Sequence, residues 1–152
     1  MKLLKVLLVV VFCFVSAGAW AATVDDLTYL TEEYPPYNMT AEDGTPTGLA
    51  VELLGAVFEK MGASTTIKDI QVVPWARGYK DVQTKPKVCL FSTNRTEERE
   101  NLFKWVGPIY TNTFNAIALK KRDFQVNSAE DLVNLQAGVI RDDTGDQLAQ
   151  SF

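Results

Sequence analysis

The residue best suited to bind a ligand is Arg99, which ends the run Ser92-Thr93-Asn94-Arg95-Thr96-Glu97-Glu98-Arg99. A guanidinium presents a planar fork of donors that matches a carboxylate bidentately, and the hydroxyls of Ser92 and Thr93 could complete the hydrogen bonds of a bound anion. Arg95 competes for the same role. Arg99 could equally be a surface arginine that pairs with a neighbouring glutamate.

Aromatic residues elsewhere in the chain are candidate walls of a pocket: Tyr34, Tyr37 and Trp75. Their rings supply flat apolar area, and the ring faces attract an ammonium group. Tyr37 is the favoured one because it follows two prolines in a rigid loop, whereas Trp75 could pack in the core. Arg77 could add a second positive contact, or lie along the surface with its charge in water.

Two carboxylates, Glu33 and Glu52, could be considered as an acid/base pair. Nothing in their spacing brings them to one site, and Glu52 fits the solvent-facing side of a helix. The sequence contains no glycine-rich phosphate loop, metal-ligand cluster or nucleophile elbow. We therefore predict no catalytic residue, no metal and no cofactor.

Composition excludes several function classes. The 152 residues include no histidine, and 15 basic against 19 acidic side chains give a net charge of -4. Without histidine there is no Ser-His-Asp or Cys-His machinery and no imidazole metal site. An acidic chain with only short basic clusters is a poor nucleic-acid binder. A binding protein without a nucleic-acid partner is favoured over an enzyme.

Residues 1–21 have the pattern of a secretory signal peptide. A basic start precedes an apolar stretch over 6–15, and an A-x-A site then places cleavage between Ala21 and Ala22. The apolar part is well short of the roughly 20 residues that span a bilayer, so a membrane anchor is the weaker interpretation. Export with removal of the signal peptide would leave Cys89 as the single cysteine. Because its neighbours in the sequence are apolar, Cys89 is expected to be a small buried hydrophobic residue.

After the leader, strand and helix patterns alternate. Strands are expected at 27–31, 65–73, 87–92, 113–119 and 137–140. One helix should begin after Gly48 and end at Gly62. Its apolar face is expected to consist of four residues at helical spacing: Leu49, Leu53, Ala56 and Val57.

Shorter helices are expected where Pro74 opens a segment with Trp75 and Tyr79, after Thr96, and after Ser128 in a capping-box sequence. The four charged residues 120–123 are interpreted as a solvent-exposed boundary between two parts of the chain. This alternation predicts an α/β fold with mainly parallel strands. Ligands of such sheets bind beyond the carboxyl ends of the strands, where the loops 33–37, 74–79 and 92–99 should meet.

Several segments together resemble one family. Tyr34-Pro35-Pro36-Tyr37, Asp43-Gly44 and the segment 48–54 resemble the opening of the family 3 extracellular solute-binding proteins, the periplasmic amino-acid-binding components of ABC importers. The run 92–99, followed by Phe103-Lys104-Trp105-Val106-Gly107-Pro108-Ile109-Tyr110, is similar to that family's second hallmark. Segments 128–132 and 137–141 are similar to the start of its second lobe.

The resemblance implies a periplasmic-binding-protein-like fold of two α/β lobes that close around a small solute. Residues 22–119 would form lobe one, and 120–152 the hinge and the start of lobe two. Arg99 would grip the α-carboxylate of an amino acid. Around it, the resemblance implies contacts from Ser92, Thr93 and Asn94, an aromatic wall at Tyr37, a donor at Thr144, and contributions from Trp75 and Arg77 in a Pro-Trp-x-Arg segment.

The chain departs from the family pattern in two places and in length. Pro86-Lys87-Val88-Cys89 stands where the family commonly has Gly-x-x-Asp, and Glu97 replaces a frequent proline. The chain stops at Phe152, so the family pattern implies a lobe one that is nearly complete and a truncated lobe two. A chain of this length is expected to be marginally stable or non-functional when it is on its own.

Three functional hypotheses follow. The leading one is a periplasmic protein that captures an amino acid or similar carboxylate and delivers it to the membrane permease of an ABC importer. The second is a periplasmic dehydratase or lyase on the same scaffold, which would need acid/base groups in its cleft. The third is a sensory or interaction module derived from the same scaffold.

Overall fold

A computed structural model describes residues 23–122, 125–133 and 135–151. The predicted signal peptide, with its cleavage site between Ala21 and Ala22, lies outside the described residues. Within them, no helix is both long and apolar enough to cross a membrane.

The centre of the fold is a three-stranded parallel sheet. It consists of β1 (Thr28–Thr31), β4 (Gln71–Val72) and β5 (Val88–Leu90), in the order β4-β1-β5. In the register, Leu30 of β1 lies beside Gln71 of β4 and Leu90 of β5. Because all the strands run in the same direction, their carboxyl ends meet at one edge, as the sequence predicted.

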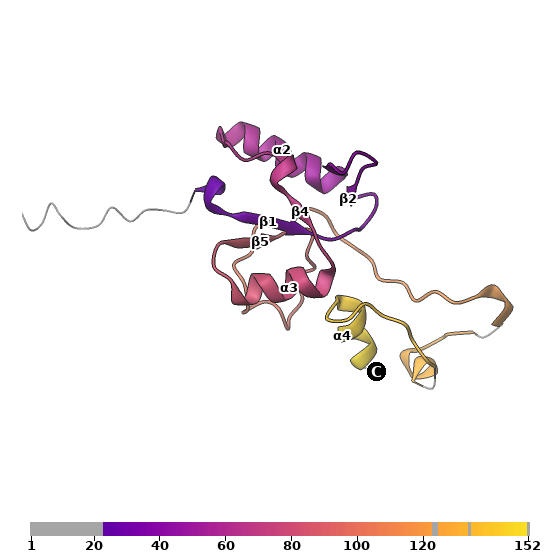
Figure 1. Ribbon diagram of the computed structural model, residues 1–152. Coiled ribbons are helices and arrows are strands. Elements are labelled where there is room, and N and C mark those ends of the chain that lie inside the picture. The colour runs from indigo at the N-terminus through magenta and orange to yellow at the C-terminus, as the bar shows by residue number, and fades with distance from the viewer. Residues whose placement is uncertain (1–22, 123–124, 134, 152) are drawn as a thin grey trace, which may run out of the picture.

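One helix covers each face of this sheet (Figure 1). The first, α2 (Leu49–Met61), lies above the sheet in that view, and α3 (Trp75–Thr84) lies below it. A small antiparallel hairpin of β2 (Met39–Thr40) and β3 (Pro46–Thr47) connects β1 to α2. The layered helix–sheet–helix arrangement is the predicted α/β fold.

The helix predicted between Gly48 and Gly62 begins and ends at its sequence signals. The α2 helix starts after Gly48 and stops at Gly62, which adopts the left-handed conformation (φ 65°, ψ 31°) typical of helix ends. Gly48 itself has φ 114°, and a Cβ there would lie 2.6 Å from the Tyr37 carbonyl oxygen. Glycine at this position therefore lets the Pro-Pro-Tyr loop pack directly on the start of the helix.

The core lies between the sheet and α2, and it consists of Tyr29, Val51, Phe58 and Ile70. The Tyr29 and Phe58 rings meet edge to face with centroids 4.8 Å apart. The predicted apolar face of α2 is wrong: Leu49, Leu53, Ala56 and Val57 are exposed, and Val51 and Phe58 are buried instead. Apolar residues occur all round this helix, so spacing alone did not identify the face that carries the large aromatic ring.

Two predicted strands are shorter than expected. In the segment 65–73 only Gln71–Val72 pairs, because η2 (Ile67–Asp69) forms a 3-10 turn in which the Asp69 carboxylate accepts the Thr66 N–H at 2.8 Å. In the segment 87–92 the strand is confined to Val88–Leu90 by Lys87 and Ser92, which both adopt positive φ angles (60° and 59°). Backbone in that region cannot continue a β-ladder.

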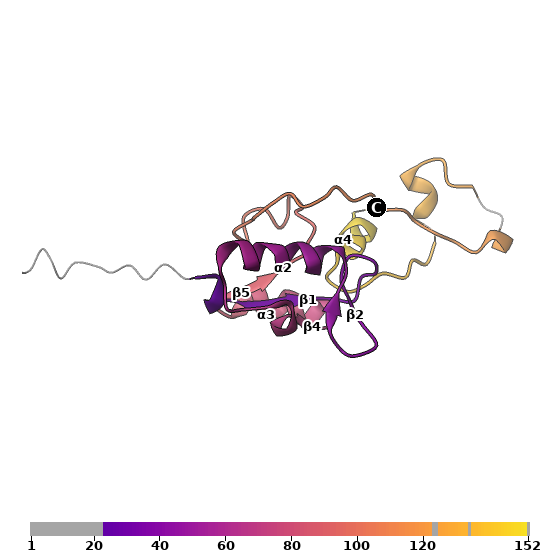
Figure 2. The same cartoon turned by 90° about the horizontal axis from the view of Figure 1, so that it is seen from above.

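The second half of the chain has less regular structure than predicted. Segments 113–119 and 137–140 form no strand, because neither finds a pairing partner among the described residues, and the chain after Thr96 forms turns instead of a helix. Three short elements follow: η3 (Lys120–Arg122), η4 (Ala129–Leu132) and α4 (Thr144–Gln150), and a further 3-10 turn, η1 (Val24–Asp26), precedes β1. The Asp131 carboxylate accepts the Ser128 N–H at 3.1 Å, as the capping-box sequence predicted. Figure 2 shows η3 and η4 lying away from the sheet.

The buried face of α2 can be tested by a pair of alanine substitutions. Phe58→Ala removes a ring that is 2% exposed, whereas Leu53→Ala removes a side chain that is 48% exposed on the same helix. We expect Phe58→Ala to lower the free energy of unfolding by about 3–5 kcal/mol and Leu53→Ala by less than about 1 kcal/mol. Urea unfolding followed by circular dichroism measures both values. Equal losses would mean that the two faces are buried alike.

Candidate functional site

The loops that follow β1, β4 and β5 converge at the carboxyl edge of the sheet. The backbone joins them directly: Val73 donates its N–H to the Thr31 carbonyl at 2.8 Å, and Phe91 donates to the Leu30 carbonyl at 3.1 Å. The α3 helix starts at this edge with Trp75, and the loop after β5 leads to Arg99. This is the place where the strand pattern predicted a site.

Arg99 is fully buried, with 0% of its surface exposed. Its Nη2 donates to the Asp142 carbonyl at 2.8 Å, and its Nη1 donates to the Asn94 carbonyl at 3.2 Å and to Thr144 Oγ1 at 3.3 Å. None of the ion pairs formed by the described residues includes Arg99. A buried cation without an anionic partner is costly, which makes this guanidinium a strong attractor of anions.

Aromatic rings surround the Arg99 guanidinium. Its central carbon lies 5.2 Å from the centroid of the Trp75 ring and 4.9 Å from that of Tyr79. These two rings stack with centroids 5.3 Å apart, and Phe103 meets Tyr79 edge to face at 5.8 Å. The rings exclude water from the guanidinium and stabilise its charge through their electron-rich faces.

Several buried polar atoms at the carboxyl edge of the sheet have no hydrogen-bond partner among the described residues. They are Thr31 Oγ1 at the end of β1, Trp75 Nε1 at the start of α3, Ser92 Oγ after β5, and Nε of Arg99 itself. Buried polar groups are normally paired, and each unpaired one costs about 1–3 kcal/mol. Their common position at the edge of the sheet suits the binding of a small polar molecule.

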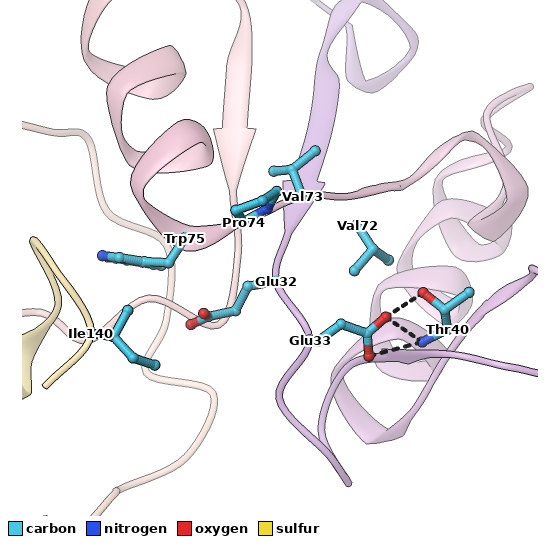
Figure 3. Close-up of a pocket in the computed structure, with 8 residues that line it drawn as sticks. All are labelled: Glu32, Glu33, Thr40, Val72, Val73, Pro74, Trp75 and Ile140. Carbon is cyan, nitrogen blue, oxygen red and sulfur yellow. Dashed lines mark hydrogen bonds between the residues drawn. The ribbon is translucent and has the colours of Figure 1, made fainter. Parts of the chain in front are cut away.

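Next to Trp75 lies a cavity of about 390 Å³ (Figure 3). It is lined by Glu32, Glu33, Thr40, Val72, Val73, Pro74, Trp75 and Ile140. Glu33 accepts hydrogen bonds from the N–H of Thr40 at 3.0 Å and from the Thr40 hydroxyl. Its neighbour Glu32 is half-buried, and burial, reinforced by the nearby Asp143, raises the pKa of Glu32 from 4.5 to about 7.

The three tyrosines near the Pro-Pro loop form a separate stack. Tyr37 lies between Tyr34, at 5.8 Å, and Tyr110, at 4.5 Å, with both pairs of rings nearly parallel. The pKa of the Tyr110 hydroxyl is raised above its ordinary value of 10.0, mainly because the group is partly buried. Both faces of the Tyr37 ring are therefore covered by tyrosines, so the edge of that ring is what remains to form a wall.

The structure brings together four of the predicted site residues: Trp75, Asn94, Arg99 and Thr144. Asn94 contributes its backbone carbonyl. Ser92 lies at the same edge with its hydroxyl unpartnered, whereas the Thr93 hydroxyl donates back to the Leu90 carbonyl at 3.2 Å.

The remaining candidates lie outside this group. Arg77 is exposed on α3. Arg95 pairs with Glu100 on the surface through a 2.6 Å hydrogen bond from Nε. Glu52 is exposed on α2, and Glu33 is engaged by Thr40, so the two do not form an acid/base pair.

Sequence reasoning missed three contributors to the site. Tyr79 was placed on the helix that Pro74 opens, but its ring was not assigned to the site. Asp142 acts through its backbone carbonyl, for which a sequence carries no signal. Glu32 could have been found, because it directly follows the first strand at the carboxyl edge where ligands of such sheets bind.

The described residues offer little to a metal. No group of three or more Cys, Asp or Glu side chains gathers among them in a way that could hold an ion. Cys89 is a free cysteine in β5, and burial raises the pKa of its thiol, which makes it a poor nucleophile. The chemistry of the site is that of hydrogen bonds, charge and aromatic surface.

The raised pKa of Glu32 predicts a pH dependence of stability. Because the folded-state pKa of about 7 exceeds the ordinary 4.5, the native state holds the proton more tightly, and its stability falls as the pH rises from about 4.5 through 7. Glu32→Gln removes this loss, so the variant should exceed the parent by about 1 kcal/mol at pH 8 and match it near pH 4. Urea unfolding at both pH values measures the difference.

Glu33→Gln is the matched control, since Glu33 is already engaged by Thr40. It should bring no gain in stability at pH 8. A Glu32→Gln variant no more stable than the parent at pH 8 would show that the Glu32 carboxyl ionises in water as usual.

Comparison with known proteins places this geometry in a family. The chain matches no curated protein and no solved structure. The family model described as bacterial extracellular solute-binding proteins, family 3, matches residues 27–150. That range contains the sheet, both covering helices, Arg99 and Thr144, and the family's role is to bind small solutes outside the cytoplasm. The chain belongs to the bacterial extracellular solute-binding proteins of family 3.

Proposed function

We propose that this protein captures an amino acid or a similar small carboxylate in the periplasm and delivers it to the membrane permease of an ABC importer. The observation that carries the proposal is the Arg99 guanidinium, buried at the carboxyl edge of the sheet with no carboxylate bonded to it among the described residues. A solute carboxylate is the counter-ion that such a site lacks.

The guanidinium has free capacity for that carboxylate. Of its five N–H donors, Nη1 and Nη2 account for three hydrogen bonds to the chain, and Nε has no partner among the described residues. Nε and Nη2 form the edge of the fork that binds carboxylates bidentately. The unpartnered Ser92 hydroxyl and Trp75 indole N–H at the same edge of the sheet are further donors for the solute.

Access to Arg99 requires movement of the segment that covers it. Asp142 and Thr144, at the start of α4, bond to the guanidinium from the distant part of the chain. We assign residues 22–119 to lobe one and 120–152 to the hinge and the start of lobe two. Opening of the lobes would draw the Asp142 carbonyl away, and closure would bring Thr144 back onto the bound solute.

The role of Arg99 can be tested by titration calorimetry with a panel of amino acids. Arg99→Lys keeps the charge and removes the planar fork, so it should weaken binding of the best amino acid by about 10- to 100-fold. The control is Arg95→Lys, in the same loop, where the arginine pairs with Glu100 on the surface and the affinity should hold. Circular dichroism establishes that both variants are folded.

A second measurement does not depend on a variant. The α-carboxamide of the best amino acid should bind the parent protein at least about tenfold more weakly than the acid, because it cannot offer two anionic oxygens to the fork. If the amide and the acid bind equally, or if Arg99→Lys binds as the parent does, Arg99 is not the carboxylate site.

One observation favours a second candidate, the dehydratase or lyase on the same scaffold. Glu32 lines the cavity beside Trp75 with a pKa of about 7, the range in which a carboxyl serves as a general acid or base. Product formation from a prephenate-like substrate, lost in Glu32→Gln, would establish this activity. The absence of turnover across a panel of such substrates would leave the binding function alone.

A further inference from the structure

Residues 140–150, here called the covering segment, lie over the carboxyl edge of the sheet and are held there by neutral acceptors. Arg99 donates to the Asp142 carbonyl at 2.8 Å and to the Thr144 hydroxyl at 3.3 Å. The loop after β5 adds a side-chain hydrogen bond to Gln147 at 3.4 Å. None of the ion pairs formed by the described residues involves the covering segment. Its docking therefore depends on a few hydrogen bonds, each of modest strength.

The covering segment is acidic where it meets the sheet. It contains Asp142, Asp143 and Asp146, against a single cation, Arg141. Hydrogen bonds from Gln150 and from the Asp142 N–H, and then the nearby Arg141, lower the pKa of Asp146. Asp143 stands at the start of α4 without a side-chain capping bond, and its carboxylate has no ion pair among the described residues. The charge of Asp143 is therefore not compensated.

Glu32 lies opposite this acidic start of α4. It follows β1 and lines the same cavity as Ile140 of the covering segment, and in Figure 3 its side chain extends toward Trp75 and Ile140. The Glu32 carboxylate has no ion pair among the described residues. Burial, and then the charge of Asp143, raise the pKa of Glu32 from 4.5 to about 7. Two uncompensated carboxyl groups therefore meet where the covering segment contacts the end of β1.

The other titratable and charged groups around Glu32 do not offset this repulsion. Glu33 lines the same cavity and adds negative charge, although it already accepts hydrogen bonds. Partial burial raises the pKa of the Tyr110 hydroxyl above 10.0, so that group is neutral near pH 7. No lysine or arginine is among the residues that line the cavity. The nearest cation of the site, Arg99, is bonded to neutral oxygens of the covering segment.

We propose that Glu32 and Asp143 form a pH-sensitive latch between the end of β1 and the covering segment. While Glu32 is protonated, only one of the two carboxyl groups carries a charge, and the segment stays docked on Arg99. When Glu32 ionises, two like charges repel across a half-buried contact, and the segment detaches more often. Detachment exposes the Arg99 guanidinium. The latch goes beyond the proposed function and does not rest on it, because docking is measured without a solute.

The direction of the pH dependence follows from the two states of the latch. In the docked state the pKa of Glu32 is about 7, and detachment returns the carboxyl to water, where its pKa approaches the ordinary 4.5. The docked state therefore holds the proton more tightly. Docking is most favourable below pH 4.5, weakens as the pH rises through 7, and then levels off.

Amide hydrogen exchange at pH 5 and pH 8, followed by mass spectrometry, tests the latch in the solute-free protein. After correction for the intrinsic exchange rate, the protection of the α4 amides should fall at least about tenfold from pH 5 to pH 8, the effect of one unit of pKa difference. At both pH values the α4 amides should be less protected than those of α2, because the covering segment opens without unfolding of the whole protein.

Three variants assign the effect. Glu32→Gln keeps the size of the side chain and removes its titration, so α4 protection should agree within about twofold at the two pH values. Asp143→Asn changes the other side of the contact and retains a good residue for the start of a helix. It should reduce the pH dependence in part, because burial is the larger cause of the raised pKa of Glu32. Glu33→Gln is the matched control and should keep the full dependence.

Every result decides for or against the latch. It is established if the fall in α4 protection disappears in Glu32→Gln, shrinks in Asp143→Asn and remains in Glu33→Gln. It is overturned if the parent shows no fall, if the fall survives in Glu32→Gln, or if α4 and α2 are equally protected. Circular dichroism checks the fold of each variant. Should Glu32→Gln not fold, an undiminished fall in Asp143→Asn overturns the latch. Amino-acid binding is tested separately by Arg99→Lys.

Discussion

The structure depends on one constraint, the burial of a guanidinium charge. Arg99 has no exposed surface, and among the described residues its charge is met only by neutral oxygens and by aromatic rings. A buried guanidinium needs hydrogen bonds and aromatic contacts from other segments of the chain. Here the loop after β5, the α3 helix and the residues at the start of α4 provide them. The arginine therefore joins the early and late parts of the chain. In the proposed function, a ligand carboxylate supplies the charge that these contacts do not.

Trp75 lies between the Arg99 guanidinium and the cavity that Glu32 lines. Pro74 ends the segment after β4 and leads into α3, which places the indole at the carboxyl edge of the sheet, where it is 5% exposed. The ring lies 5.2 Å from the Arg99 carbon and also lines the cavity that contains Glu32. Positive and negative groups thus lie near the same ring.

Structural features that depend on local sequence rules were predicted correctly. Features that depend on strand pairing or on packing between distant segments were not. The glycines at 48 and 62 predicted the ends of α2, and the alternation of elements predicted the parallel sheet. The buried face of α2 was wrong, because Phe58 packs on Tyr29 and only the tertiary fold makes that contact. Segments 113–119 and 137–140 have strand-like composition, but β-structure requires a neighbouring strand. Arg99 and Thr144 were both predicted, whereas the carbonyl of Asp142 could not be, since any residue carries one.

A chain without histidine can still carry a group that titrates near neutral pH. Histidine is the usual residue for this purpose because its ordinary pKa is about 6.5. Here burial and the neighbouring Asp143 bring the pKa of Glu32 to about 7. The energetic cost of that environment falls on the folded protein as long as the carboxylate is unpaired, and a cation that pairs with it removes the cost. Any group that pairs with this carboxyl in the folded state therefore stabilises the folded protein by mass action.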